Sequence, residues 1–422
     1  MLKGFKYRIY PTEEQAVLID KHIGCTRLVY NLGLEAKKLA YLGSKTSLSY
    51  FDLNTQLNEL KKEYDWLKEV NAQSMQTSLR NLDDAFTRFF TKQNSFPQFR
   101  KKSGRQSFSC PQHTSIDWAE KKLYLIKFSE GIAIELHRSF NGKIKNTTIR
   151  KTATGKYFAS VLVENEATIP VKPAPAKERA VGIDVGIISM AVIADRNLES
   201  VSTIENPKRL LKKQHLLKRR QRQLSKKVKG SKNREKARLK LARLHETITR
   251  QRLDFTHKLT YKLTHDNQVD TICIEDLNIS GMVKNHKLAG AISAVAWGEM
   301  FRQLEYKSDW YGKNLLRAHR FSATSKMCRC CKNINNELTL KDRTWICPTC
   351  KSVNDRDENA VPNIIDSAFE QYNKNRDGLP ELKPDARPVR RAGDKSTETT
   401  RFRVRQEKSL TQEKLVDISH SI

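Results

Sequence analysis

Two closely spaced pairs of cysteines lie in the C-terminal half of the chain. Cys328 and Cys331 form one C-x-x-C unit, and after fifteen residues Cys347 and Cys350 form a second. Two such units at this separation are typical of a zinc ribbon, in which four thiolates surround one Zn²⁺ tetrahedrally. We therefore predict a structural zinc site. Cys330 is an extra cysteine inside the first unit, and we interpret it as a bystander.

An acidic motif, D-R-D-E-N, follows the second cysteine pair at residues 355–359. Two other acidic residues end apolar runs: Asp184 in A-V-G-I-D and Glu275 in T-I-C-I-E. A carboxylate within a buried strand is costly to desolvate unless a cation pairs with it. We expect Asp184, Glu275 and one of Asp355 or Asp357 to cluster around Mg²⁺ or Mn²⁺, which prefer oxygen ligands. Spacing alone leaves the choice between Asp355 and Asp357 open.

The segments around these carboxylates predict the sheet that must position them. Asp184 lies on the first of two adjacent strands, and Glu275 ends a later strand. An amphipathic helix over 290–312 and a strand over 314–321 follow, and a helix over 359–372 comes after the acidic motif. This order of strands and helices fits an RNase H-like sheet.

A strongly basic insertion separates the two acidic strands. Residues 207–252 hold nineteen Lys or Arg against only Glu235 and Glu246, which gives +17 of the chain's +31. Leucines recur every seven residues before a Gly-Ser turn, and a second apolar series with heptad-type spacing (Ala237, Leu241, Leu244 and Ile248) follows the turn. This pattern predicts an antiparallel helical hairpin. Because charges of one sign repel each other, we expect a polyanionic partner for this hairpin.

The N-terminal part predicts helices and a small β-barrel. A strand over 6–10 is followed by a capping box at Thr12 and Gln15, which starts a helix. Helical patterns then cover 51–64 and 72–90. Alternating β-branched segments from 121 to 164 predict antiparallel strands, and a proline-rich linker ends this part of the chain.

The loop F-P-Q-F-R-K-K at 96–102 combines aromatic and basic residues. This mixture suits stacking on nucleobases together with contacts to phosphates. The alternative is that Phe96 and Phe99 only fix the loop to the core. Both interpretations stay open from the sequence.

No apolar run of about 18 residues is present, which argues against a membrane-spanning protein. The first residues have no apolar stretch typical of a signal peptide. Clustered cysteines outside any disulfide pattern indicate a reducing compartment. The polar segment 373–422 predicts a disordered tail.

Several motifs together resemble the TnpB family, which IS200/IS605-type transposons encode and which is ancestral to the type V CRISPR Cas12 effectors. They are G-I-D-V-G, I-E-D-L, the paired C-x-x-C units, D-R-D-E-N-A, F-P-Q-F-R-K-K, R-L-D-F-T-H-K and W-G-E-M-F-R-Q-L-E-Y-K. The resemblance implies an RNA-guided, metal-dependent DNA endonuclease that cuts next to a short motif. It selects Asp357 as the third catalytic carboxylate beside Asp184 and Glu275. Its partners would be a guide RNA from the transposon end and double-stranded target DNA.

The resemblance also implies a fold class and a location. The expected class is a multidomain α/β and α+β protein with a RuvC-type nuclease domain and an N-terminal wedge barrel. The expected domains are the wedge (1–10 and 103–167), a helical recognition domain (11–102), a linker (168–179), the nuclease domain (180–372, with the basic hairpin at 207–264 and the zinc ribbon at 322–354) and the tail (373–422). We expect a monomer with one RNA in the prokaryotic cytoplasm, associated with the nucleoid.

We expect nucleic-acid contacts in three places. A loose alignment with the family puts two residues at the target-adjacent motif, the aromatic and basic loop adds five, and the hairpin adds six. They are Tyr50, Gln76, Phe96, Phe99, Arg100, Lys101, Lys102, Arg219, Arg220, Arg222, Lys226, Lys227 and Arg252.

Three alternatives to this function remain, and one residue departs from the family pattern. The alternatives are a nuclease-dead RNA-guided regulator, a compact CRISPR effector and a transposase that acts without RNA. Pro362 follows the acidic motif where the family usually has another residue. It is tolerated if the helix begins near Asn359, whereas inside the helix it clashes with the Glu358 carbonyl and can tilt Asp357.

Overall fold

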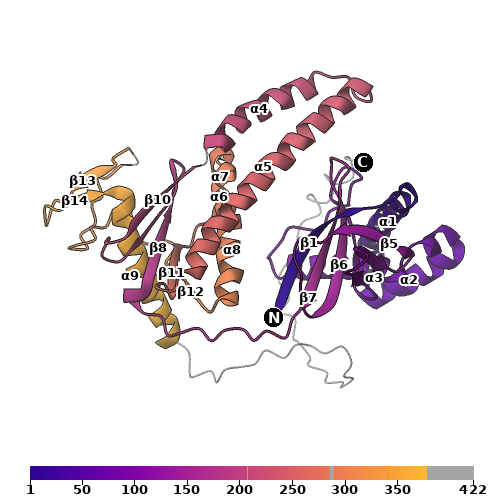
Figure 1. Ribbon diagram of the computed structural model, residues 1–422, viewed down its shortest axis with the longest axis horizontal. Coiled ribbons are helices and arrows are strands. Elements are labelled where there is room, and N and C mark those ends of the chain that lie inside the picture. The colour runs from indigo at the N-terminus through magenta and orange to yellow at the C-terminus, as the bar shows by residue number, and fades with distance from the viewer. Residues whose placement is uncertain (207, 286–288, 340, 378–422) are drawn as a thin grey trace. The chain divides into compact units, whose positions relative to one another are not determined.

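A computed structural model describes residues 1–206, 208–285, 289–339 and 341–377 (Figure 1). The last helix continues to Asp377, so the predicted helix end at 372 was too early. From residue 378 onward, the predicted tail lies outside the described residues.

A seven-stranded antiparallel sheet contains the segments predicted to form the barrel. Its order is β2-β6-β7-β1-β5-β4-β3. The strands are β1 (Leu2–Tyr10), β2 (Gln106–Cys110), β3 (Ser115–Asp117), β4 (Lys122–Leu125), β5 (Phe128–Glu135), β6 (Lys143–Lys151) and β7 (Tyr157–Glu164). Phe108 of β2 and Ile116 of β3 belong to the same hydrophobic core, so the two end strands curl around one interior. Within the described residues these end strands do not pair with each other.

Three α-helices and a short 3₁₀ helix accompany this sheet. They are α1 (Glu13–Ser44), α2 (Tyr50–Glu63), η1 (Asp65–Glu69) and α3 (Ala72–Phe90). The capping box of Thr12 and Gln15 is confirmed at the start of α1. Leu34, Leu53 and Leu79 are buried in the core that the helices share. Gly33 allows α1 and α3 to approach closely, because a Cβ there would lie 2.9 Å from the Leu79 side chain.

A five-stranded sheet of order β10-β9-β8-β11-β12 lies in the second half of the described chain. Its strands are β8 (Ala180–Val185), β9 (Ser189–Asp195), β10 (Val201–Glu205), β11 (Thr271–Glu275) and β12 (Asn314–Ala318). The central strands β8, β11 and β12 run parallel, whereas β9 and β10 are antiparallel. This is the predicted RNase H-like arrangement, although β12 ends three residues before the expected position.

Helices cover both faces of this sheet. On one face, α9 (Arg356–Asp377) packs Val361 and Ile365 so closely that a Cβ at Gly182 would lie 2.7 Å from Val361. On the other face, Ile183 and Ile274 share a core with the helices α5, α7 and α8. The remaining helices and the ribbon strands are α4 (Lys208–Ser225), α5 (Lys232–His265), α6 (Ile279–Met282), α7 (Ala289–Val295), α8 (Trp297–Trp310), β13 (Thr344–Ile346) and β14 (Val353–Asp355).

Two helix predictions need correction. The single helix expected over 290–312 is divided into α7 and α8, because Ala296 adopts a left-handed conformation with φ 59°. The other correction concerns Pro362, which lies inside α9 because that helix already begins at Arg356. Pro362 therefore cannot donate to the Glu358 carbonyl. In the described part of the chain, no helix is both long and apolar enough to cross a membrane.

Candidate active site, zinc ribbon and nucleic-acid interface

Asp184 and Glu275 lie at corresponding ends of neighbouring parallel strands. Asp184 is the second-last residue of β8, and Glu275 is the last residue of β11. Each follows by two positions a residue that packs toward α9, namely Gly182 and Cys273. Because strand side chains alternate, both carboxylates face α9, whose second residue is Asp357. The fold thus brings the three predicted carboxylates to one end of one face of the sheet.

The electrostatics of these carboxylates favour a bound cation. Burial raises the pKa of Asp184 well above its usual value, and the Glu275 and Asp357 carboxylates raise it further. The Arg356 guanidinium lowers this pKa and so opposes the rise. Burial also raises the pKa of Glu275, although a hydrogen bond from Thr324 opposes the rise. A partly buried group of oxygen ligands that repel one another fits a divalent cation such as Mg²⁺ or Mn²⁺.

The two aspartates of the D-R-D-E-N motif have different surroundings. Asp355 Oδ1 accepts hydrogen bonds from the backbone N–H groups of Asp357 and Glu358, at 2.9 and 3.0 Å, so Asp355 caps the N-terminus of α9. The Asp357 carboxylate contributes to the field at Asp184 and forms an ion pair of 3.1 Å with Arg343 of the ribbon. This difference was not visible in the spacing of the motif.

The four predicted zinc ligands come together in the ribbon. The Sγ atoms of Cys328, Cys331, Cys347 and Cys350 all lie within 4.8 Å of one another. Cys331 Sγ lies 3.5 Å from Cys347 Sγ, and Cys328 Sγ lies 3.6 Å from Cys350 Sγ. These distances are near the separation of about 3.8 Å expected for tetrahedral zinc thiolates and are too long for disulfides. Cys330 is exposed and stands outside the group.

The chemistry of this cysteine group also fits Zn²⁺. Although burial raises it, the pKa of Cys328 is lowered to about 6 by the backbone N–H groups of Cys331 and Cys330 and by the Ser352 hydroxyl. A thiolate is the form that binds zinc. Among the described residues, no other group of three or more potential ligands lies as close together, so the three carboxylates are not yet a closed metal site.

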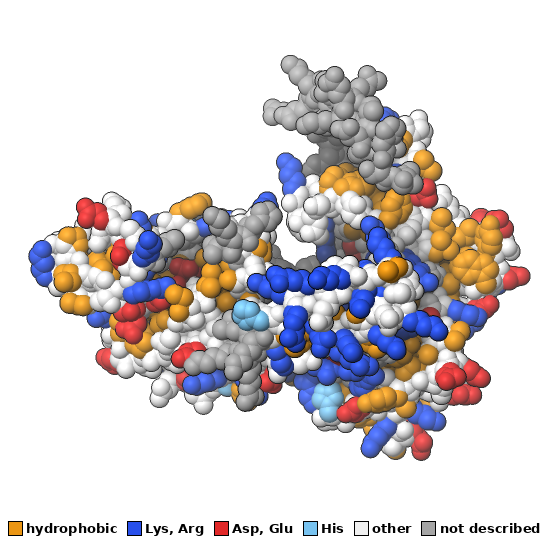
Figure 2. Space-filling view, turned by 90° about the horizontal axis from the view of Figure 1, so that it is seen from above, with side chains coloured by type: hydrophobic (Ala, Val, Ile, Leu, Met, Phe, Trp, Pro, Cys, Tyr) orange, Lys and Arg blue, Asp and Glu red, His pale blue; other side chains and the backbone are white. Residues whose placement is uncertain are grey.

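The basic hairpin consists of α4 and α5, and Lys and Arg side chains gather over it in the space-filling view (Figure 2). Its acidic residues Glu235, Glu246 and Asp254 pair with Arg238, Arg250 and Lys258 on the same helix. Of the predicted contact residues on the hairpin, four are exposed: Arg219, Arg222, Lys226 and Lys227. Arg220 is partly exposed and donates a hydrogen bond to Gln223.

Arg252 differs from the other predicted contacts of the hairpin. Its side chain is partly buried, and burial lowers its pKa. Its Nε atom is buried and has no hydrogen-bond partner among the described residues.

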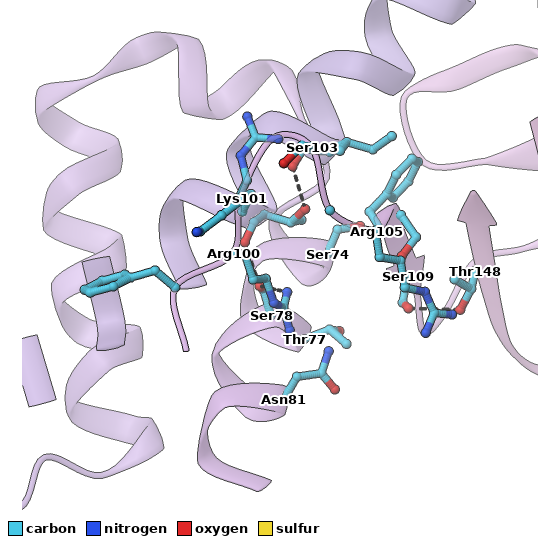
Figure 3. Close-up of a pocket in the computed structure, with 17 residues that line it drawn as sticks. Ser74, Thr77, Ser78, Asn81, Arg100, Lys101, Ser103, Arg105, Ser109 and Thr148 are labelled. Carbon is cyan, nitrogen blue, oxygen red and sulfur yellow. Dashed lines mark hydrogen bonds between the residues drawn. The ribbon is translucent and has the colours of Figure 1, made fainter. Parts of the chain in front are cut away.

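A cavity of about 650 Å³ opens beside the predicted aromatic and basic loop (Figure 3). Arg100, Lys101 and Arg105 line it together with hydroxyl and amide groups of α3 such as Thr77 and Asn81. No acidic residue belongs to the lining. A positive, hydroxyl-rich cavity of this kind suits a phosphate backbone, which accepts hydrogen bonds from Arg, Lys, Ser, Thr and Asn.

Arg100 is held in place within this cavity. Its guanidinium stacks 3.6 Å from the ring centroid of Tyr30 and donates a hydrogen bond of 3.2 Å to Ser78 Oγ. Of the lining residues, only Phe99, Arg100 and Lys101 were predicted from the sequence. The others were missed because segments distant in the chain bring them together, and they include Arg27, Ser74, Thr77, Asn81 and Arg105. The only local signal was Arg105, which continues the basic run of the loop.

The other predicted contacts around the loop divide into anchors and exposed groups. Phe96 packs edge-on against Phe86 and Phe89, as the alternative interpretation expected. Phe99 lines the cavity and lies under the Lys38 ammonium group. Of the seven predicted contact residues that precede the hairpin, four lie outside the lining of this cavity: Tyr50, Gln76, Phe96 and Lys102. The ring of Tyr50 faces the Arg80 guanidinium.

Three family models match the chain. They are OrfB_IS605, described as "Probable transposase", over 160–286, the Cas12f1-like TNB domain over 297–364, and a helix-turn-helix domain of OrfB_IS605 over 1–45. Residues 1–45 form strand β1 and the single helix α1 in this structure, rather than two helices joined by a turn.

Relatives with assigned names cover most of the chain. A protein of Streptomyces pristinaespiralis with the name "Putative RNA-guided DNA endonuclease" is 39% identical over 367 residues, which are 86% of this chain and 88% of the relative. InsQ of Escherichia coli K12, which has the same kind of name, is 30% identical and covers 86% of this chain and 92% of its own. A Cas12f1 chain solved with single-guide RNA and target DNA matches with TM-score 0.54 at 15% identity over 84% of this chain and 83% of its own.

The sheet topology, the helices on its two faces and the inserted ribbon define an RNase H-like nuclease fold that carries a zinc ribbon. The sequence identities with the two named relatives, each over more than four-fifths of the chain, narrow this class of protein to one family. The chain belongs to the TnpB family, encoded by IS605-type transposons.

Proposed function

We propose that this protein is an RNA-guided, metal-dependent DNA endonuclease that cleaves target DNA next to a short motif. The observation that carries the proposal is the convergence of Asp184, Glu275 and Asp357 at one end of the sheet. The names of the family relatives point to the same activity.

Asp184, Glu275 and Asp357 would hold two Mg²⁺ or Mn²⁺ ions. Such ions activate water and stabilise the leaving oxygen in phosphodiester hydrolysis. Asp184 is partly buried within strand β8, so it fixes one side of the site, whereas Asp357 lies at the start of α9, is partly exposed and can adjust to the bound strand. The four ribbon cysteines would hold a structural Zn²⁺ that is separate from the catalytic ions.

Guide RNA and double-stranded target DNA are the partners in this proposal. The exposed cations of the hairpin and the positive cavity at Arg100 are the surfaces that support it. The nuclease domain would comprise residues 180–372, and the sheet and helices before the linker would form the wedge and recognition domains. Because guide pairing supplies sequence specificity in such effectors, the protein itself would read mainly shape, phosphates and the adjacent motif.

The test uses protein co-expressed with its guide RNA and a DNA target library. We expect RNA to copurify, and we expect cleavage that needs Mg²⁺ and is lost in Asp184→Ala. Copurifying RNA and target binding without cleavage would instead support a nuclease-dead regulator. Specific cleavage by protein free of RNA would contradict the proposal.

A further inference from the structure

A short segment connects the catalytic sheet to the first zinc knuckle. It follows β12 and reaches Cys328. Within it, the Thr324 hydroxyl donates a hydrogen bond of 2.8 Å to Glu275 Oε1. Thr324 is only 5% exposed, so water cannot readily replace this donor.

The backbone of this segment is fixed to α9 by two buried asparagines. Asn363 Nδ2 donates to the carbonyl oxygens of Thr324 and Met327, at 3.0 and 2.7 Å. Asn359 Nδ2 donates to the same Met327 oxygen at 2.7 Å, and its Oδ1 accepts from the backbone N–H of Arg329 at 2.9 Å. The position of Thr324 is therefore set by α9 and by the start of the zinc knuckle together.

The far side of the same knuckle is tied to the same helix. Lys332 Nζ donates to Asn363 Oδ1 at 3.0 Å and to Asp366 Oδ2 at 2.8 Å. Asp366 also pairs with Lys177 and Arg196, which lie just before β8 and just after β9. The knuckle is thus fixed to α9 at Met327, Arg329 and Lys332, and through Asp366 to the sheet.

We propose that Thr324 is a positioning residue that orients Glu275 for metal binding, and that Asn363 couples this orientation to the zinc ribbon. The inference rests on the proposed nuclease function. Without a donor, the Glu275 side chain can rotate away from Asp184, since the repulsion between the two carboxylates favours separation. With the donor in place, Oε1 is held and the carboxylate stays directed toward Asp184 and Asp357. The ribbon then contributes to the site through Glu275 as well as through its proximity to Asp357.

Two substitutions separate the hydroxyl from the rest of the side chain. Thr324→Val keeps the shape and removes the donor, whereas Thr324→Ser keeps the donor and removes one methyl group. If the hydrogen bond matters, Thr324→Val slows single-turnover cleavage about tenfold and raises the Mg²⁺ concentration that gives half-maximal rate. Thr324→Ser then stays within about twofold of the wild type, and target binding is the same in all three proteins.

A second measurement reports on metal binding without relying on DNA cleavage. Fe²⁺ and hydrogen peroxide are added to the ribonucleoprotein, and oxidative cuts in the polypeptide near residues 184 and 275 are mapped with a terminal tag. Asp184→Asn identifies the cuts that depend on the site. We expect these cuts to be several-fold weaker in Thr324→Val and close to wild type in Thr324→Ser, because the first variant lacks the donor and the second retains it.

Asn363→Ala tests the coupling to the ribbon. We expect it to weaken the Fe²⁺-dependent cuts and to accelerate the release of zinc to a chelator, while Thr324→Val leaves zinc release unchanged. The role of the hydroxyl would be overturned if the Fe²⁺-dependent cuts in Thr324→Val were as strong as in the wild type. It would also be overturned if these cuts were weakened equally in Thr324→Val and Thr324→Ser. Absence of DNA cleavage by the wild-type ribonucleoprotein would contradict the proposed function, and the Fe²⁺ comparison would still decide the positioning role.

Discussion

The two candidate metal sites of this protein are assembled to different degrees. In the ribbon, four sulfur atoms lie within 4.8 Å of one another, as a zinc site requires. At the end of the sheet, three carboxylates share a face, but Asp357 pairs with Arg343, and within the described residues they do not form a closed ligand group.

The difference follows from the charge of the ligands and from the chain that carries them. Thiols can be neutral and share protons, so four of them can approach without a metal. Carboxylates repel one another, and the raised pKa of Asp184 records that repulsion together with burial. The cysteines also belong to one short ribbon, whereas the carboxylates come from β8, β11 and α9. One short segment therefore brings the four cysteines together, whereas the three carboxylates depend on the packing of β8, β11 and α9.

The largest expected effect tests whether repulsion dominates the carboxylate site. Asp184→Asn should reduce cleavage by at least about 1,000-fold, since in the proposed mechanism Asp184 is a ligand of the catalytic ions. The same substitution should raise the melting temperature of metal-free protein, because it removes a buried, repelled charge. Single-turnover cleavage and thermal unfolding of the same preparation measure the two effects. A lower melting temperature would show that Asp184 is stabilised by contacts rather than strained by repulsion.

The second prediction tests the preassembled ribbon. Cys347→Ser should lose the bound zinc and slow cleavage about 100-fold, because a misplaced ribbon displaces the start of α9. Cys330→Ser is the matched control and should keep both zinc and activity, since Cys330 lies outside the ligand group. Zinc content by mass spectrometry and cleavage rates provide the measurements. Loss of zinc from the control would assign Cys330 to the site.

The third prediction concerns the ion pairs between the two sites. Asp366→Asn leaves Lys332, Lys177 and Arg196 without their shared carboxylate, and should lower the free energy of unfolding by about 1–2 kcal/mol after allowance for solvent screening. Although burial raises it, these three cations lower the pKa of Asp366.

The pH dependence of this stabilisation gives a check on its cause. Because the folded-state pKa is lowered, the contribution is fully present above the ordinary aspartate pKa of about 4 and is lost as pH falls through the lowered value. Denaturant unfolding of both proteins should therefore show a constant difference above about pH 5 that shrinks in stronger acid. A difference that does not change with pH would assign the effect to packing.

The smallest expected effect concerns Pro362. Pro362→Ala restores a backbone donor for the Glu358 carbonyl and should stabilise the protein by about 1 kcal/mol. If the proline tilts Asp357, cleavage should also rise. An unchanged cleavage rate with higher stability would show that the first turn of α9, held by Asp355, is insulated from the proline.

Sequence patterns predicted the structure best where neighbouring residues alone cause the pattern. The C-x-x-C spacing, the Thr12 capping box and the alternating strands each depend on neighbours in the chain, and the structure confirms the capping box and the strands and brings the cysteines together. They predicted helix boundaries less well, because residues distant in the chain help to determine where a helix begins and ends. Hydrophobic periodicity did not report the break at Ala296 or the start of α9 at Arg356, three residues before the predicted start.

The amino-acid sequence by itself determined the zinc ribbon, the basic hairpin and the acidic residues that end apolar strands, because each is written in residue type and spacing. Only the tertiary structure decided what those residues touch: the Arg343 partner of Asp357 and the hydrogen bond from Thr324 to Glu275. The reason is physical. Such contacts join segments up to 49 residues apart, and their geometry exists only when sheet, helix and ribbon pack together.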